Sequence, residues 1–220
     1  ASVGRGHPTP AGPVPMVPAA ILFDLLIGDG NVRPGAKEGV AAYGAITGDP
    51  VSQGSVGAGT GAIVAGWRGP EAVRKGGVGS TAMTVGEATL GVLVVLNAVG
   101  DVFTLDGLAL TGGAPVPPPA PAGIRPIEQT TLVALATDAA ASRTDLMRLA
   151  VRAHDALAVC LRPSHTRYDG DAVFAVSSGD RVVDADELGE AAFRVVGRAI
   201  ELAVTKAQSV AGIPVVELRS

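Results

Sequence analysis

The chain has 220 residues, of which 47% are hydrophobic and 17% charged, and its formal net charge at pH 7 is −4. This composition excludes an intrinsically disordered chain, which needs low hydrophobicity and high net charge. The length is enough for one domain with a sizeable core. We expect no nucleic-acid partner, because the sequence has no basic block that would offer a positive face to phosphates.

The number of cysteines and the length of the apolar runs indicate where in the cell the protein is expected. Cys160 is the single cysteine, which permits no internal disulfide and favours a reducing compartment, so we expect a cytoplasmic protein. The longest apolar run, Thr89–Gly100, is interrupted by Asn97 and is too short to span a bilayer, so we expect no membrane partner. The N-terminus shows no signal-peptide pattern. Because the chain begins with Ala1 and not with Met, we interpret it as a fragment, a processed chain or a protein whose start is missing.

Two elements are predicted before the first glycine-rich stretch. An apolar run predicts a buried strand over Ala19–Leu26. Apolar residues then recur at helical spacing from Pro34 to Ile46. Because Pro34 stands at the start and Gly48 just past the end, this segment predicts a helix.

Glycine-dense stretches and a long apolar run follow. The stretches Gly54–Gly61 and Lys75–Ser80 predict loops. Thr89–Phe103 predicts a long buried strand, or two strands bent near Asn97–Gly100. The sequence Gly57–Ala62 loosely fits the dinucleotide-binding pattern G-x-G-x-x-A, but the strand, helix and acidic residue that this pattern requires are not evident. We therefore interpret it as a tight turn.

The segment 112–129 holds six of the 16 prolines and is interpreted as a linker, because prolines neither donate to a sheet nor continue a helix. The elements predicted after it alternate between strand and helix. They are a strand over Thr130–Thr137, a helix capped by Ser142, a strand over Ala172–Val176, a helix capped by Asp184 and a strand over Val210–Leu218. Because the strands are apolar throughout, we expect helices to flank the sheet, as in an α/β fold.

One polar cluster stands out, because His165, Asp169 and Asp171 lie within the seven residues HTRYDGD. As a metal site they would offer one imidazole and two carboxylates, which suits a hard divalent ion. As a turn, Asp-Gly-Asp would lead into the strand that begins at Ala172. A third interpretation is that the two carboxylates orient an amine and stabilise its charge.

The end of the linker forms a second candidate site. The proline-rich segment runs directly into an apolar strand whose first residue, Thr130, carries a hydroxyl nucleophile. A threonine at a strand start is common, so an ordinary strand start is one interpretation. The other is an N-terminal nucleophile: cleavage between Gln129 and Thr130 would free an α-amine with a pKa of about 7.7–8.0, which can act as the base for the hydroxyl.

Several phrases, in one order along nearly the whole chain, make the sequence similar to a known family. The phrases are PVPMVPAAILFDL, GSVGAGTGA, KGGVGS, LVVLNAVGD, TTLVALATDA, AHDAL and HTRYDGDAVF. In these phrases the chain resembles the L-aminopeptidase/D-amidase (DmpA-like) family of self-cleaving hydrolases, which includes the nylon-oligomer hydrolases.

The resemblance implies an α/β fold with four layers, an αββα sandwich. Family members have further strands before the PVPMVP phrase, so the N-terminal part of the fold is expected to be missing from this chain. Residues 1–220 would form a single hydrolase domain. Self-cleavage would divide it into an α-chain part, 1–129, which includes the linker 112–129, and a β-chain part, 130–220.

The resemblance also implies a role for each site residue. Thr130 would be the nucleophile and the new N-terminus, and Asn97 would stabilise the oxyanion through its side-chain amide. Lys75 would lie in the active site. Asp169 and Asp171 would contact the nucleophile and tune its amine. No metal or organic cofactor is required.

The function implied is a self-processing amide hydrolase of the aminopeptidase or amidase type. Its substrates would be short peptides or amide oligomers, and the family commonly forms homo-oligomers, often tetramers. Gln129 departs from the Asn or Gly that commonly precedes the cleaved bond. Two alternatives stay open: a metal-dependent hydrolase that uses His165, Asp169 and Asp171, and a non-catalytic relative, for which Gln129 is the only indication.

Overall fold

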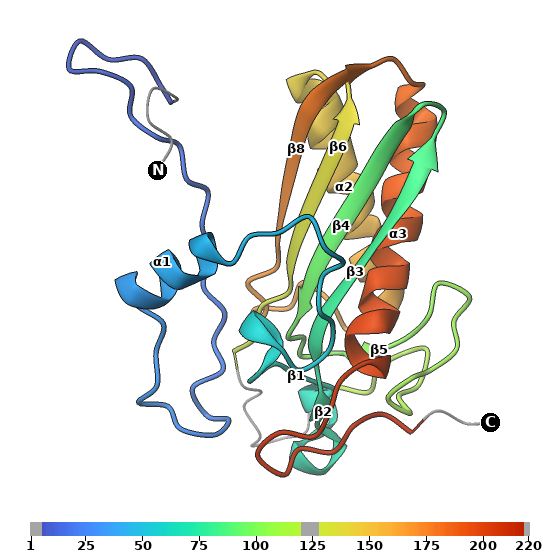
Figure 1. Ribbon diagram of the computed structural model, residues 1–220. Helices are drawn as coiled ribbons and strands as arrows, with labels where there is room; N and C mark the ends of the chain where they lie inside the picture. The colour runs from blue at the N-terminus through green and yellow to red at the C-terminus, as the bar shows by residue number, and fades with distance from the viewer. Residues whose placement is uncertain (1–5, 120–127, 218–220) are drawn as a thin grey trace.

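The computed structural model describes residues 6–119 and 128–217 and is built around one four-stranded sheet (Figure 1). The strand order is β3-β4-β6-β8. The strands are β3 (Gly77–Val85), β4 (Ala88–Leu96), β6 (Leu132–Ala139) and β8 (Ala172–Arg181). β3 and β6 are antiparallel to β4, and β8 is parallel to β6. As a result, β3, β6 and β8 all begin at the end of the sheet where β4 ends.

Two long helices form a layer on one face of this sheet (Figure 1). They are α2 (Arg143–Cys160) and α3 (Ala185–Thr205). Both start at the predicted caps: the Ser142 hydroxyl accepts a hydrogen bond from the Asp145 N–H, and the Asp184 carboxylate accepts two, from the backbone N–H groups of Asp186 and Glu187. Side-chain oxygens at these positions satisfy N–H groups that have no partner within the helix.

Shorter elements lie at the end of the sheet where β6 begins. They are β1 (Ile63–Val64) paired with β2 (Arg74–Lys75), β5 (Asp101–Val102) paired with β7 (Leu161–Arg162), and the single-turn helices η1 (Gly57–Gly59), η2 (Gly66–Arg68) and η3 (Pro70–Ala72). The helix α1 (Ala36–Gly44) stands apart from the sheet and has no buried residue (Figure 1). None of the helices in the part of the chain that the structure describes is long and apolar enough to cross a membrane.

The two faces of the sheet differ in burial. On β6, Val133 and Leu135 point into the core against the helices, whereas Ala134 and Ala136 are exposed. Val176, which pairs with Ala136, is 54% exposed on the same outer face. Residues 6–119 and 128–217 thus contribute one sheet and one helical layer, with an apolar outer sheet face of the kind that sandwiches bury.

Most predicted elements of the C-terminal half are confirmed. The helices after Ser142 and Asp184 are α2 and α3, and the strands predicted over Thr130–Thr137 and Ala172–Val176 are β6 and β8. The run Thr89–Phe103 is confirmed as two strands, because the chain bends between β4 and β5.

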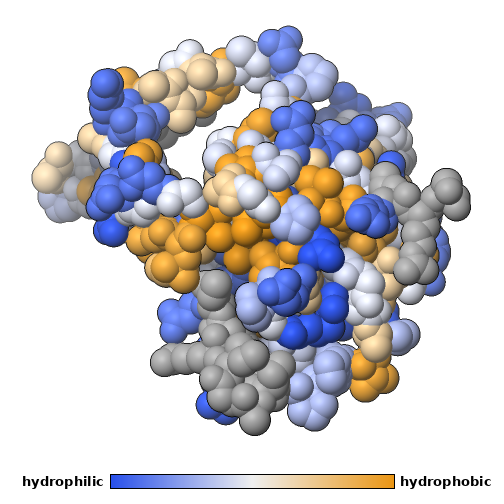
Figure 2. Space-filling model, turned by 90° about the horizontal axis from the view of Figure 1, so that it is seen from below, coloured by the Kyte–Doolittle hydropathy of each residue, from blue (hydrophilic) through white to orange (hydrophobic). Residues whose placement is uncertain are grey.

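Three predicted elements are wrong. Ala19–Leu26 is coil on an exposed N-terminal arm, where Ile21 is 92% exposed and no sheet edge in the described residues pairs with it. Seen from below, the arm stands off the rest of the molecule and hydrophobic side chains gather beside it (Figure 2). Val210–Leu218 forms only an isolated bridge between Val210 and Ile213 within its described residues, and Leu218 lies outside them.

The third wrong prediction concerns the glycine-rich loop Lys75–Ser80, which forms the end of β2 and the start of β3. Its glycines serve close packing instead. A Cβ atom at Gly79 would lie 1.8 Å from the carbonyl oxygen of Ala199 in α3. The missing side chain therefore allows the helix to lie directly on the strand.

We predict that Gly79→Ala lowers the free energy of unfolding by about 1–3 kcal/mol, because the added methyl group must push α3 away from β3. Gly91→Ala on β4 is the matched control, since its Cβ would meet its nearest neighbour, the Ala136 oxygen, at 3.9 Å. Urea unfolding followed by circular dichroism measures both variants. Equal stability of the two would contradict the packing argument.

Candidate functional site

The predicted site residues gather where β6 and β8 begin. Asn97 directly follows β4, Thr130 stands two residues before β6, and Asp171 directly precedes β8. Val95 pairs with Leu132, so β4 ends beside the start of β6, and Asn97 Oδ1 lies 3.4 Å from Gln129 Nε2. Strand order and direction therefore assemble the site from segments that are distant in sequence.

The peptide bond between Gln129 and Thr130 is held in the extension of the sheet. The Gln129 N–H donates to the Tyr168 oxygen at 2.8 Å, and the Gly170 N–H donates to the Gln129 oxygen at 2.9 Å. A Cβ atom at Gly170 would lie only 2.8 Å from the Thr130 Oγ1 atom. The hydroxyl thus occupies space that only a glycine leaves, beside a carbonyl that already accepts a backbone hydrogen bond.

Asp169 is bound to its own loop. Its Oδ2 atom accepts hydrogen bonds from the Thr166 N–H at 2.9 Å and the Thr166 hydroxyl at 2.7 Å, and its Oδ1 atom accepts one from the Val99 N–H at 3.4 Å. Burial raises the pKa of the Asp169 carboxyl above its ordinary value, and the bonds from Thr166 oppose this shift. In this structure Asp169 therefore shapes the turn before β8.

Asp171 connects the start of β6 with two histidines. Its Oδ1 atom accepts a hydrogen bond from the Thr131 N–H at 2.8 Å, and its Oδ2 atom lies 3.0 Å from the Nδ1 atom of His165. The Nε2 atom of His165 lies 3.3 Å from the Nδ1 atom of His154 in α2. Burial lowers the pKa of His154, and the neighbouring His165 lowers it further. His154 could not be linked with this site from the sequence, because only the packing of α2 brings its ring next to His165.

The three residues of the metal alternative do not form one ligand set. Asp169 accepts hydrogen bonds from Thr166 and Val99, whereas Asp171 accepts one from Thr131 and lies beside His165 without a hydrogen bond to it. Across residues 6–119 and 128–217, no group of three His, Cys, Asp or Glu side chains is arranged to hold a metal ion.

Lys75 lies within the molecule with 0% of its surface exposed. Its Nζ atom donates to the carbonyl oxygens of Gly59 at 3.2 Å, Thr60 at 3.0 Å and Ala62. Burial lowers the pKa of this ammonium to about 8, and the carboxylate of Asp24 partly opposes the shift. The glycine-rich stretch Gly54–Gly61 is thus a cradle of backbone carbonyls for one buried cation.

Asn97 is fully buried and already bonded through both ends of its amide. Its Oδ1 atom accepts a hydrogen bond from the Ile63 N–H at 2.9 Å, and its Nδ2 atom donates to the Phe23 oxygen of the N-terminal arm at 3.1 Å. The Gln129 Nε2 atom lies 3.4 Å from Asn97 Oδ1. The side chain therefore lies next to residue 129, while its amide nitrogen donates to the arm.

The chain is anchored just before the predicted linker, at Thr111, and again within it, at Pro118. Arg68 and Asp101 form an ion pair at 2.8 Å, and the Asp101 Oδ1 atom accepts the Thr111 hydroxyl at 2.7 Å. The Trp67 indole N–H donates to the Pro118 oxygen at 2.8 Å. The middle of the predicted linker, residues 120–127, lies outside the described residues.

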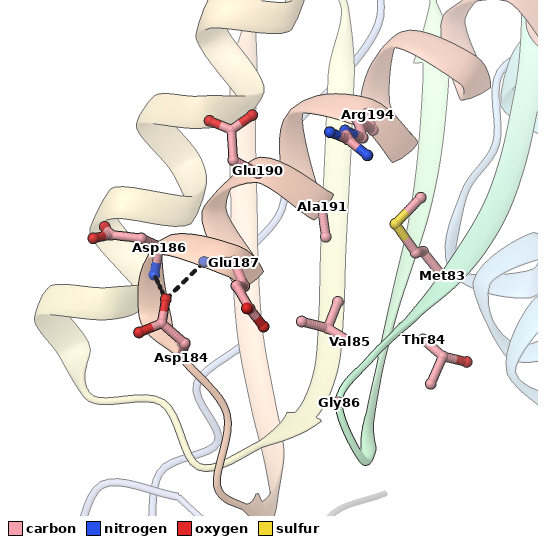
Figure 3. Close-up of a pocket in the computed structure, with 10 residues that line it drawn as sticks. All are labelled: Met83, Thr84, Val85, Gly86, Asp184, Asp186, Glu187, Glu190, Ala191 and Arg194. Carbon is pink, nitrogen blue, oxygen red and sulfur yellow. Dashed lines mark hydrogen bonds between the residues drawn. The ribbon is translucent and has the colours of Figure 1, made fainter.

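A cavity of about 530 Å³ lies at the opposite end of the sheet, between the β3–β4 turn and the start of α3 (Figure 3). Its lining includes none of the predicted site residues in the described chain. Asp184, one of its carboxylates, is occupied in capping α3 through bonds of 2.9 Å to the Asp186 and Glu187 N–H groups. The cavity is therefore separate from the chemistry at Thr130.

The model of peptidase family S58 matches residues 6–216, and the chain belongs to this family. It is 38% identical to an uncharacterized aminopeptidase of Mycobacterium leprae (strain TN), over 96% of this chain and 66% of that protein. It is 36% identical to an uncharacterized aminopeptidase of Mycobacterium tuberculosis (strain H37Rv), over 96% of this chain and 69% of the relative. The chain thus spans about two thirds of the length of these relatives.

Two solved structures share the fold. A beta-aminopeptidase of a Burkholderia species aligns with a TM-score of 0.65 and 25% identity, over 88% of this chain and 59% of that chain. The L-aminopeptidase D-Ala-esterase/amidase of Ochrobactrum anthropi, described as a variant of the Ntn hydrolase fold, aligns with a TM-score of 0.60 and 26% identity, over 81% and 51%. These likenesses confirm the predicted α/β class and the family resemblance.

We predict that Lys75 titrates near pH 8, because its pKa is lowered to about 8 from 10.5. The native protein then releases this proton at a lower pH than the unfolded chain, so the free energy of unfolding should rise between about pH 8 and pH 10.5. NMR of lysine labelled with ¹³C at Cε measures the titration, and Lys75→Met identifies the signal. A midpoint near 10.5 would contradict the prediction.

Proposed function

We propose that the whole protein is a self-processing amide hydrolase of the aminopeptidase or amidase type, in which Thr130 becomes the N-terminal nucleophile. The observation that carries this proposal is the geometry of the junction: the Thr130 hydroxyl lies against Gly170, whose N–H binds the Gln129 carbonyl at 2.9 Å. Membership of peptidase family S58 and the aminopeptidase names of the relatives support the class of reaction.

Self-cleavage would begin with attack of the Thr130 Oγ atom on the Gln129 carbonyl carbon. The Gly170 N–H, which already binds this oxygen, would stabilise the negative charge that develops on it. The C–N bond breaks as the hydroxyl proton passes to nitrogen, and an ester of Gln129 on Thr130 results. Water then hydrolyses the ester and leaves Thr130 with a free α-amine.

In turnover, the freed α-amine would take the proton of the Thr130 hydroxyl as the latter attacks a substrate amide. Asp171, whose Oδ1 atom accepts the Thr131 N–H and whose Oδ2 atom has no hydrogen-bond partner among the described residues, would stabilise the charged amine. Asn97 would stabilise the oxyanion once its bond to the Phe23 oxygen is released. Lys75 would add a buried positive charge in the carbonyl cradle nearby. The sequence of steps uses no metal and no organic cofactor.

Short peptides or amide oligomers are the proposed substrates, and a homo-oligomer such as a tetramer is the proposed assembly. The exposed apolar side chains of the arm support burial of that segment in the whole protein: Met16, Val17 and Ile21 are 77%, 78% and 92% exposed. A non-catalytic relative with the same fold is the alternative that the self-cleavage experiment decides.

We predict that Thr130→Val abolishes self-cleavage, whereas Thr131→Val preserves it. Both substitutions replace a hydroxyl with a methyl group, but only Thr130 can attack the Gln129 carbonyl. Thr131 is a suitable control because its buried Oγ1 atom has no hydrogen-bond partner among the described residues. Denaturing mass spectrometry of the purified proteins should show a chain that begins with Thr130 in the wild type and in Thr131→Val only.

Incubation of the wild-type protein in excess chelator distinguishes the Thr130 mechanism from the metal-dependent alternative. Cleavage and amide hydrolysis that continue unchanged in chelator support the Thr130 mechanism. Loss in chelator with recovery on adding a divalent ion supports the metal-dependent hydrolase. An intact wild-type chain without amidase activity supports the non-catalytic relative.

We predict that Gly170→Ala slows self-cleavage by about 100-fold, because a Cβ atom 2.8 Å from Thr130 Oγ1 must displace the attacking hydroxyl. Gly66→Ala is the control on the other side of residue 129, since its Cβ would lie 3.8 Å from Gln129 Oε1, an ordinary contact. The rate at which the chain from Thr130 appears measures both. Equal rates of self-cleavage in the two variants would contradict the role proposed for Gly170.

A further inference from the structure

We infer that the recess that holds the Gln129 side chain becomes the pocket for the acyl residue of the substrate, and that it selects a neutral carboxamide side chain, as in an N-terminal glutamine. The inference rests on the proposed function. It adds a substrate preference that depends on how residue 129 is bound before the chain is cut.

Self-cleavage and turnover pass through intermediates of the same kind, each an ester of the Thr130 oxygen. In self-cleavage, the Thr130 oxygen forms a bond to the Gln129 carbonyl carbon, the bond from that carbon to nitrogen breaks, and the hydroxyl proton moves to nitrogen. The product is a peptidyl ester of Thr130, in which Gln129 is the acyl residue. In turnover, the N-terminal residue of the substrate forms an aminoacyl ester on the same oxygen. Its side chain therefore starts from the same carbon and meets the same surroundings as that of Gln129.

The recess is built from hydrogen-bond acceptors. Gln129 is 3% exposed, and its Nε2 atom donates to the Ile63 oxygen at 3.1 Å and lies 3.4 Å from Asn97 Oδ1. The latter atom is an acceptor because it also receives the Ile63 N–H at 2.9 Å. Two oxygens therefore face the end of the side chain, and an apolar side chain of the same length would leave them without this donor.

Charge restricts the fit further. A carboxylate in place of the carboxamide would bring its oxygens against the two acceptors, without a proton to share. A second ammonium would enter beside the Lys75 cation, whose Nζ atom binds the oxygen of Ala62, the residue next to Ile63. A neutral carboxamide donates to the acceptors without adding a charge, so it fits the recess best.

The backbone of residue 129 indicates where the free amine of such a substrate would bind. The Gln129 N–H donates to the Tyr168 oxygen at 2.8 Å. In an N-terminal residue this nitrogen is the α-amine, which would donate to the same oxygen. Gln129 thus occupies the position of a substrate residue that would be bound through both its amine and its side chain.

The test uses the self-cleaved protein and the p-nitroanilides of L-glutamine, L-methionine and L-glutamate, with enzyme-free blanks. Methionine matches the length of the glutamine side chain without its donor, and glutamate matches its shape with a charge. We expect kcat/KM to be about tenfold higher for the glutamine anilide than for either of the others, which corresponds to the loss of one buried hydrogen bond.

A second measurement uses the uncut chain. Gln129→Met and Gln129→Glu should slow self-cleavage by about the same factor as the matching substrates lose in kcat/KM, because the same recess binds the side chain in both reactions. Once cut, both variants begin with the same Thr130, so each should show the wild-type order of substrates.

The outcomes are distinct. Hydrolysis of all three anilides at equal kcat/KM, or a preference for methionine or glutamate, overturns the carboxamide pocket and leaves the proposed function standing. The absence of both self-cleavage and hydrolysis overturns the proposed function, and the pocket with it. A preference for glutamine in turnover without any effect of residue 129 on self-cleavage overturns the claim that one recess serves both reactions.

Discussion

The candidate site depends on the parallel pairing of β6 with β8. The ladder continues past the strand starts through the bridge between Gln129 and Asp169, and the Ala172 N–H donates to the Thr131 oxygen at 3.0 Å. Backbone hydrogen bonds therefore hold the chain on both sides of the bond before Thr130. Parallel strands need a long crossover, which α2 provides, so the junction is positioned by the core of the molecule rather than by a free loop.

Close packing at glycines connects this frame to the site. Gly79 allows α3 to lie on β3, and Gly170 leaves space for the Thr130 hydroxyl. In both places the neighbour is less than 3 Å from where a Cβ atom would be, so the requirement is for space rather than for a special backbone conformation. A glycine in a phrase such as KGGVGS can therefore indicate contact between elements as well as a loop.

Buried polar groups distinguish this end of the sheet from the rest of the core. Lys75, Asn97 and Gln129 are each at most 3% exposed, and each has hydrogen-bond partners for its side chain. Burying a charge or an amide costs free energy unless such partners are present. Buried polar side chains that have hydrogen-bond partners within an otherwise apolar core are typical of functional sites.

Local pattern was enough to predict α2, α3, β6 and the bend after β4, because apolar spacing, capping residues and punctuation act between neighbours in the chain. The junction at Thr130 was also visible, as a proline-rich linker that meets an apolar strand. Composition could not show that Ala19–Leu26 is an exposed arm, because a strand exists only where a partner strand is present.

Only the tertiary structure decided which groups meet. The Gly170 donor to the Gln129 carbonyl, the contact of His165 with His154 and the arm's bond to Asn97 join segments far apart in the sequence or separated by a turn. Such hydrogen bonds depend on strand register and helix placement, which no short stretch of residues encodes. The sequence by itself determined the residue types available for the chemistry, and the packing of the strands determined their partners.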